Sequence, residues 1–129
     1  MSSMSSRASD YILVVEDDRD LREILGESLE LEGYDVVSAE HGQAALQKLE
    51  TGPRPCVILL DLMMPVMDGW AFRQEILKHP SLADIPVVIM TAAGAERART
   101  IPSDGVLHKP LAMDAVIEAV QGYCHGPVR

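Results

Sequence analysis

The chain has 129 residues, a length typical of one domain; 47% of them are hydrophobic but only 4% aromatic, which predicts an aliphatic core. The net charge of −9 argues against direct binding of nucleic acid, because phosphate recognition needs clustered lysine and arginine. No apolar run approaches the roughly 18 residues of a membrane span, so we expect no membrane insertion.

The first residues of the chain are polar and rich in serine, and they lack the apolar middle of a secretory signal. We therefore expect a disordered tail over 1–9, one domain over 10–125 and a short tail over 126–129. The lack of a signal favours a reducing, cytoplasmic location. In that compartment Cys56 and Cys124 are expected to be two unpaired thiols.

Five short β-rich runs follow the first tail. They are YILVV (11–15), DVVSA (35–39), CVILL (56–60), PVVIM (86–90) and GVLH (105–108). The first, third and fourth runs are continuously apolar, as expected of strands that are buried on both faces of a parallel sheet.

Segments with a helical repeat of apolar residues separate these runs. The first ends at Gly33, which suits the left-handed position after a helix, and others lie at 44–49, 72–77 and 113–120. Over 92–104 the repeat is weak, and we expect a short or irregular element there. Strands and helices thus alternate, which predicts a doubly wound α/β sheet with right-handed crossovers.

Polar residues stand where the predicted strands end. Glu16 and Asp17 follow the first strand, Asp61 follows the third, and Thr91 and Lys109 follow the fourth and fifth. In an open α/β sheet, ligands bind at the carboxyl ends of the strands. Clustered carboxylates favour a hard cation that takes oxygen ligands, and Mg²⁺ suits them better than Mn²⁺ or Ca²⁺. Carboxylate, cation, ammonium and hydroxyl together are the parts of a phosphoryl-transfer site.

The motifs VED (15–17), DLMMPVMDG (61–69), TA (91–92) and KP (109–110), in this order, resemble the receiver domain of two-component response regulators. The resemblance covers residues 11–124. It implies a flavodoxin-like fold with five parallel strands in the order 2-1-3-4-5 and helices on both faces. It also implies a signalling domain, either stand-alone or part of a longer protein with an output domain, and monomeric or weakly dimeric. Such a domain is not an ordinary enzyme but catalyses its own phosphorylation and slow dephosphorylation.

The resemblance implies roles for the acidic residues. Asp61 would accept a phosphoryl group from a phosphohistidine on a sensor histidine kinase or a histidine phosphotransfer protein, in a Mg²⁺-dependent reaction. Asp17 and Asp61 would bind the metal directly, Glu16 through water, and Met63 through its backbone carbonyl. Phosphorylation would then switch the conformation and act on a downstream partner that the sequence does not name.

The remaining motif residues have roles around the phosphoryl group. Thr91 would hydrogen-bond one of its oxygens, Lys109 would pair with Asp61 or its phosphate, and the Lys109–Pro110 peptide would be cis. The chain departs from the family pattern at Val106, where many receivers carry Tyr or Phe. It also has a shorter segment than typical relatives between Thr91 and Lys109.

Other interpretations remain beside the signalling domain. A phosphatase with an aspartate nucleophile usually needs a second carboxylate two residues later, and Met63 at that position counts against it. A degenerate receiver that only binds partners is disfavoured by the intact motifs, although Val106 and the short segment leave it open. Nucleotide binding is not expected, because no G-x-G-x-x-G or Walker A motif occurs. The histidines have no spacing typical of a metal site.

Overall fold

The computed structural model describes residues 11–64, 66–92 and 100–124. The tails expected over 1–9 and 126–129 lie outside these residues. Most of the segment 92–104, for which we expect a short or irregular element, lies outside them as well. No helix in the described part of the chain has the length and apolar character needed to cross a membrane.

Five parallel strands form one sheet in the order β2-β1-β3-β4-β5, which confirms the predicted fold class. The strands are Tyr11–Val15 (β1), Asp35–Ala39 (β2), Val57–Asp61 (β3), Val87–Thr91 (β4) and Gly105–His108 (β5). β1 lies between β2 and β3, and its register pairs Val15 with both Ala39 and Leu60. The carboxyl ends of β1 and β3 are therefore neighbours.

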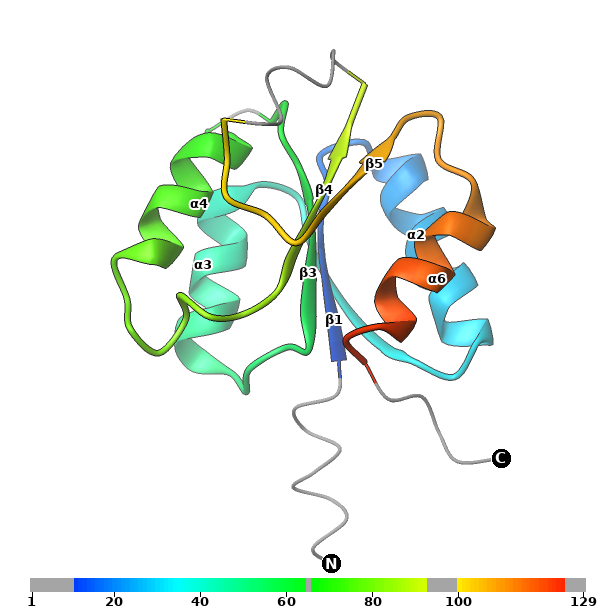
Figure 1. The fold of residues 1–129 in the computed structure, drawn as a ribbon, viewed down its shortest axis with the longest axis horizontal. Coiled ribbons are helices and arrows are strands. Elements are labelled where there is room, and N and C mark those ends of the chain that lie inside the picture. Colours follow the sequence, from blue (N-terminus) through cyan, green and yellow to red (C-terminus); the bar gives the residue numbers. More distant parts are fainter. Residues whose placement is uncertain (1–10, 65, 93–99, 125–129) are drawn as a thin grey trace, which may run out of the picture.

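Helices cover both faces of this sheet. Within the described residues they are Arg19–Leu31 (α2), Gly42–Thr51 (α3), Gly69–Leu77 (α4) and Met113–Gln121 (α6). α3 and α4 lie on one face, and α2 and α6 lie on the other (Figure 1). This cover explains why β1, β3 and β4 are buried at every position.

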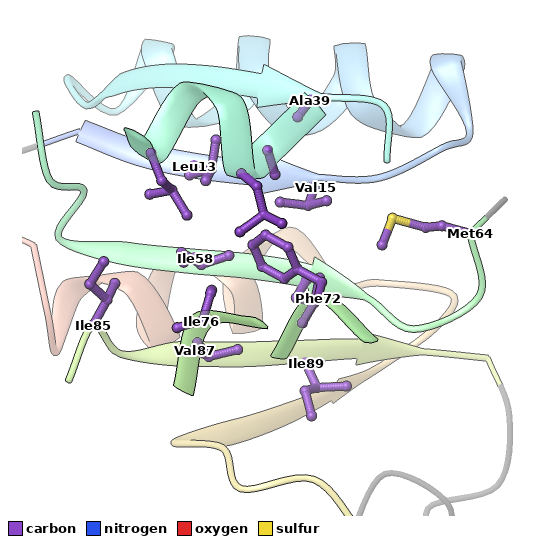
Figure 2. Packing of buried hydrophobic residues seen from close by; sticks show 14 of the residues in the cluster. Leu13, Val15, Ala39, Ile58, Met64, Phe72, Ile76, Ile85, Val87 and Ile89 are labelled. Atoms are coloured by element: carbon purple, nitrogen blue, oxygen red, sulfur yellow. The ribbon is translucent and has the colours of Figure 1, made fainter. Parts of the chain in front are cut away.

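The core has two halves, one on each face of the sheet. Alternate residues of β1 enter opposite halves, because successive side chains of a strand point to opposite faces. Leu13 and Val15 pack on the side of α3 and α4, together with the fully buried Phe72 of α4 (Figure 2). Ile12 and Val14 pack on the side of α2 and α6. Burial of each such side chain contributes roughly 2 kcal/mol.

The helix ends are defined by local hydrogen bonds. Asp18 and Asp68 begin α2 and α4, and each side chain accepts a hydrogen bond from the backbone N–H three residues later. Gly33 follows α2 with a φ of 98°, which confirms the predicted left-handed end. α3 begins differently: Nδ1 of His41 accepts from the N–H of Ala44 at 3.1 Å. The sequence does not predict this cap, because histidine is not among the preferred capping residues.

The expectation of two unpaired thiols is wrong. Cys56 and Cys124 form a disulfide, with their Cα atoms 5.4 Å apart. Cys56 directly precedes β3, and Cys124 follows α6, which returns the chain to the edge of the sheet where β3 begins. The two cysteines are 68 positions apart, so only the fold reveals that they are neighbours. The disulfide lies at the end of β3 opposite to Asp61.

Candidate functional site

Three carboxylates meet at the carboxyl ends of β1 and β3. Asp61 is the last residue of β3, and Glu16 and Asp17 directly follow β1. One carboxylate oxygen from each residue lies within 4.8 Å of the others. Glu16 is fully buried and Asp61 is 3% exposed, whereas Asp17 is open to solvent. The pairing of β1 with β3 thus assembles an acidic cluster from two distant parts of the sequence.

The cluster places unfavourable negative charge around Asp61. Burial, together with the charge of Glu16, raises the pKa of Asp61 to about 7, and a hydrogen bond with Asp17 acts in the same direction. The charge of Lys109 lowers this pKa but does not outweigh the rest. A cation between the carboxylates would favour their ionised forms. Hard oxygen donors with one side open to water fit Mg²⁺, which keeps several water ligands in proteins.

Lys109 brings a positive charge to this cluster. Its Nζ lies 2.8 Å from Oε1 of Glu16 and 3.3 Å from Oδ1 of Asp61. Burial acts to lower the pKa of Lys109, but the hydrogen bonds and charges of the two carboxylates outweigh burial and raise it. The lysine is therefore a permanent cation at neutral pH.

The position of Lys109 is determined by the ends of β4 and β5. Its backbone N–H donates to the carbonyl of Thr91 at 2.9 Å, and the Lys109–Pro110 peptide is cis. Thr91 is the last residue of β4 and is 1% exposed. Thr91 and Lys109 thus lie next to each other at the same edge of the sheet as the carboxylates.

The loop after Asp61 is in close backbone contact with β3. The N–H of Met63 donates to Oδ1 of Asp61 at 3.4 Å, and the Met63 side chain is 55% exposed. A Cβ atom on Gly69 would lie 2.8 Å from Cα of Leu62 and 2.9 Å from the carbonyl oxygen of Asp61. The glycine of the DG motif is therefore required, because α4 begins directly against the backbone of the candidate site. Val66 in this loop has a φ of 68°, which a β-branched residue rarely adopts.

α4 begins at this loop, and its side chains contact the segment before β5. Nε1 of Trp70 donates to Oγ1 of Thr100 at 3.1 Å, and Nε of Arg73 donates to the carbonyl of Pro102 at 2.9 Å. Trp70 and Arg73 are one turn apart on α4, so the same side of the helix makes both contacts. Val106, at the position where many receivers carry an aromatic residue, is half-buried and packs against the core below α3 and α4.

One residue that contacts the acidic loop was not predicted from the sequence. Arg22 of α2 binds the backbone carbonyls of both Glu16 and Asp17. The sequence signal for this contact is an arginine in the first turns of a helix that directly follows the acidic end of a strand. That signal is weak, because most such side chains point into solvent.

Residues 12–121 match the family model of the response regulator receiver domain. The match spans most of the chain, and the chain therefore belongs to this family. Receiver domains are the phosphorelay signalling domains of two-component systems rather than ordinary enzymes. They bind Mg²⁺ at an acidic pocket, and family membership implies a histidine kinase as partner.

Two similar proteins are transcriptional regulators. The chain is 40% identical over 103 residues to a transcriptional regulatory protein, a CpxR homolog from Haemophilus influenzae, with 77% of this chain and 43% of the relative covered. It is 33% identical over 114 residues to the DNA-binding dual master transcriptional regulator RpaA of a Synechocystis strain, with 85% and 47% covered. The chain thus spans less than half the length of these relatives.

Three similar solved structures are receiver domains or response-regulator and chemotaxis proteins. The signal receiver domain of a histidine kinase from Syntrophus aciditrophicus has a TM-score of 0.82 and 29% identity, with 89% of each chain covered. The response regulator TrrA from Thermotoga maritima, in complex with Mg²⁺-BeF, has a TM-score of 0.78 and 32% identity over 88% of this chain and 98% of that chain. Chemotaxis protein CheY4 from Vibrio cholerae has a TM-score of 0.80 and 26% identity over 90% and 99%.

Proposed function

We propose that Asp61 of this chain accepts a phosphoryl group from a phosphohistidine on a sensor kinase or a phosphotransfer protein, in a reaction that requires Mg²⁺. The observation that carries the proposal is the cluster of the buried Asp61 and Glu16 with the exposed Asp17, against which Lys109 lies. A cytoplasmic location and a further protein as recipient of the signal belong to the same proposal.

In the transfer, an Oδ atom of Asp61 forms a bond to phosphorus while the phosphorus–nitrogen bond of the phosphohistidine breaks. The electron pair of that bond stays on the imidazole nitrogen, which takes up a proton. Lys109 holds a positive charge beside the oxygens on which negative charge gathers. The metal would be held by Asp17, Asp61 and the Met63 carbonyl, with Glu16 binding through water, and when bound it supplies further neutralisation of those oxygens.

Phosphorylation replaces one negative charge on Asp61 by about two and adds strong acceptor oxygens. The Thr91 hydroxyl then donates to a phosphoryl oxygen, and Lys109 shifts from Glu16 toward the new charge. Thr91 ends β4, and the segment after it leads to Thr100 and the contact with Trp70. A change at Thr91 therefore has a route to the surface formed by α4 and the segment before β5.

The test is modification by a small phosphodonor. The full chain is incubated with acetyl phosphate, with Mg²⁺ or with a chelator, and its intact mass is recorded. A parallel sample with beryllofluoride, which mimics the phosphoryl group without forming an acyl phosphate, is followed by the fluorescence of Trp70, the one tryptophan of the chain. We expect Mg²⁺-dependent modification that is lost in Asp61→Asn and strongly weakened in Asp17→Ala. Asp20→Asn, which removes an exposed acid on α2, is the matched control and should behave as wild type. Modification that survives Asp61→Asn overturns the assignment.

A further inference from the structure

We infer that Arg22 is a positioning residue for the metal site, acting on the backbone of the two residues that carry its carboxylates after β1. The inference rests on the proposed function, since it assigns Glu16 and Asp17 to that site. Arg22 itself contacts no ligand atom of the cluster in the described contacts; it contacts the carbonyl oxygens of Glu16 and Asp17.

Both carbonyls stand where the strand pairing of β1 ends. Nη1 of Arg22 lies 2.8 Å from the carbonyl oxygen of Glu16 and 3.3 Å from that of Asp17. On the other side of the chain, the N–H of Glu16 donates to the carbonyl of Ala39 at 3.0 Å. A backbone carbonyl at a strand end needs a new partner once the ladder stops, and a guanidinium supplies a charge-assisted one.

The first turn of α2, which carries Arg22, is also hydrogen-bonded to the loop that holds Glu16 and Asp17. The backbone N–H of Arg22 donates to the carbonyl of Asp18 at 2.9 Å, and the N–H of Asp18 donates to Oε2 of Glu16 at 3.1 Å. The start of α2 is therefore bonded to the loop through Asp18, and Arg22 adds the bonds to the two preceding carbonyls. Together these contacts limit the rotation of the peptide units that set the directions of the Glu16 and Asp17 side chains.

The charge of Arg22 and its positioning role predict opposite effects on metal binding. A positive charge near the cluster repels a divalent cation, so removal of that charge alone would tighten Mg²⁺ binding. A residue that preorganises the ligands strengthens binding, so its removal would weaken Mg²⁺ binding. The sign of the change therefore distinguishes the two roles.

Arg19 provides a matched control on the same helix. It is exposed, and its Nε lies 3.1 Å from Oε2 of Glu23, in an ion pair one turn along the surface. Arg19→Ala removes the same charge as Arg22→Ala, near the same loop. It does not remove a bond to the carbonyls of Glu16 or Asp17, since no such bond is among the described contacts of Arg19.

The experiment measures Mg²⁺ affinity of the full chain by isothermal titration calorimetry, with the folded state of each variant verified by urea unfolding. We expect Arg22→Ala to bind Mg²⁺ about tenfold more weakly, Arg22→Lys to recover part of the loss, and Arg19→Ala to bind as wild type or slightly tighter. With acetyl phosphate, the Mg²⁺ concentration for half-maximal modification of Arg22→Ala should rise, while the maximum at saturating Mg²⁺ stays near wild type.

Unchanged or tighter Mg²⁺ binding by Arg22→Ala overturns the inference and leaves the proposed function standing. If Arg22→Ala does not fold, Arg22→Lys and Arg22→Gln take its place. Weaker Mg²⁺ binding by Arg22→Gln than by wild type, with Arg22→Lys between the two, supports the inference. Mg²⁺ binding by Arg22→Gln that equals or exceeds that of wild type overturns it. A wild-type chain that binds no Mg²⁺, or binds it equally after Asp17→Ala, overturns the proposed function and this inference together.

Discussion

The ammonium group of Lys109 lies closer to Glu16 than to Asp61, at 2.8 Å against 3.3 Å. The lysine therefore neutralises a fully buried neighbour of the proposed phosphoacceptor as well as the phosphoacceptor itself. The negative charge of Glu16 still raises the pKa of Asp61, and the positive charge of Lys109 still lowers it. The ionisation of Asp61 thus depends on the balance between these two neighbours.

Opposite changes to this balance should move the pKa of Asp61 in opposite directions. Lys109→Met keeps the length of the side chain but removes the cation, so in metal-free protein the pKa of Asp61 should rise above about 7. Glu16→Gln removes the repelling charge, so that pKa should fall. The carboxyl carbon resonance of Asp61, followed by NMR through a pH titration in the presence of a chelator, measures both. Shifts of the same sign in the two variants would contradict this account of the site.

The raised pKa of Asp61 also makes metal-free stability depend on pH. Asp61 has a pKa of about 7 when folded against 3.8 ordinarily, so between these values the folded state binds more protons than the unfolded state. The contribution of Asp61 to the free energy of unfolding should therefore decrease as pH rises through this window, by roughly 4 kcal/mol. Urea unfolding in a chelator at several pH values measures the trend.

Two controls belong with that pH series. Asp61→Asn should be more stable than wild type at the upper end of the window and should lack the decrease that Asp61 causes. Addition of Mg²⁺ to the wild-type chain should recover stability there, because the cation binds only the folded cluster. If wild type and Asp61→Asn have parallel pH profiles, Asp61 does not carry the perturbed pKa.

Much of the site could be predicted because its residues stand at the ends of apolar runs. In a parallel sheet, all strands end at the same edge, so Asp61, Glu16 and Thr91 could be placed near one another from strand order alone. The strand order itself came from the family resemblance. What could not be predicted is which partner the long side chain of Lys109 prefers, since that depends on distances of tenths of an ångström.

The missed features depend on contacts between distant segments or on unusual residue choices. The disulfide of Cys56 with Cys124 requires knowing where α6 ends relative to β3, which no local pattern encodes. The burial of Arg73 against the carbonyl of Pro102 depends likewise on the path of the chain before β5. His41 caps α3 through its imidazole, a use that propensities do not favour.

Gly69 provides a test of the close contact between α4 and β3. Gly69→Ala would put Cβ against backbone atoms of Asp61 and Leu62, which cannot move aside as a flexible side chain could. We expect a loss of about 2 kcal/mol in the free energy of unfolding, with weaker Mg²⁺-dependent modification of Asp61. Urea unfolding and the acetyl phosphate assay measure the two effects.

Gly26 is the matched control for that substitution. It lies inside α2, and a Cβ there would meet only Cγ1 of Val36, at an ordinary distance of 3.9 Å. Gly26→Ala should therefore stabilise the chain, by about 0.5–1 kcal/mol, because alanine favours a helix interior over glycine. A Gly69→Ala variant as stable as Gly26→Ala would mean that α4 does not start against the backbone of β3.

The disulfide should stabilise the fold without being part of the phosphorylation site. A crosslink between residues 68 positions apart restricts the unfolded chain, and the chain-entropy account gives about 4 kcal/mol for a loop of this size. Thermal unfolding of the wild type should therefore shift to lower temperature in a thiol reductant, whereas Cys124→Ser should unfold at one temperature with or without it. Because the bond lies at the end of β3 opposite to Asp61, the reduced chain should still bind Mg²⁺ while it remains folded. A wild type whose unfolding is insensitive to the reductant would show that the two thiols are not paired in solution.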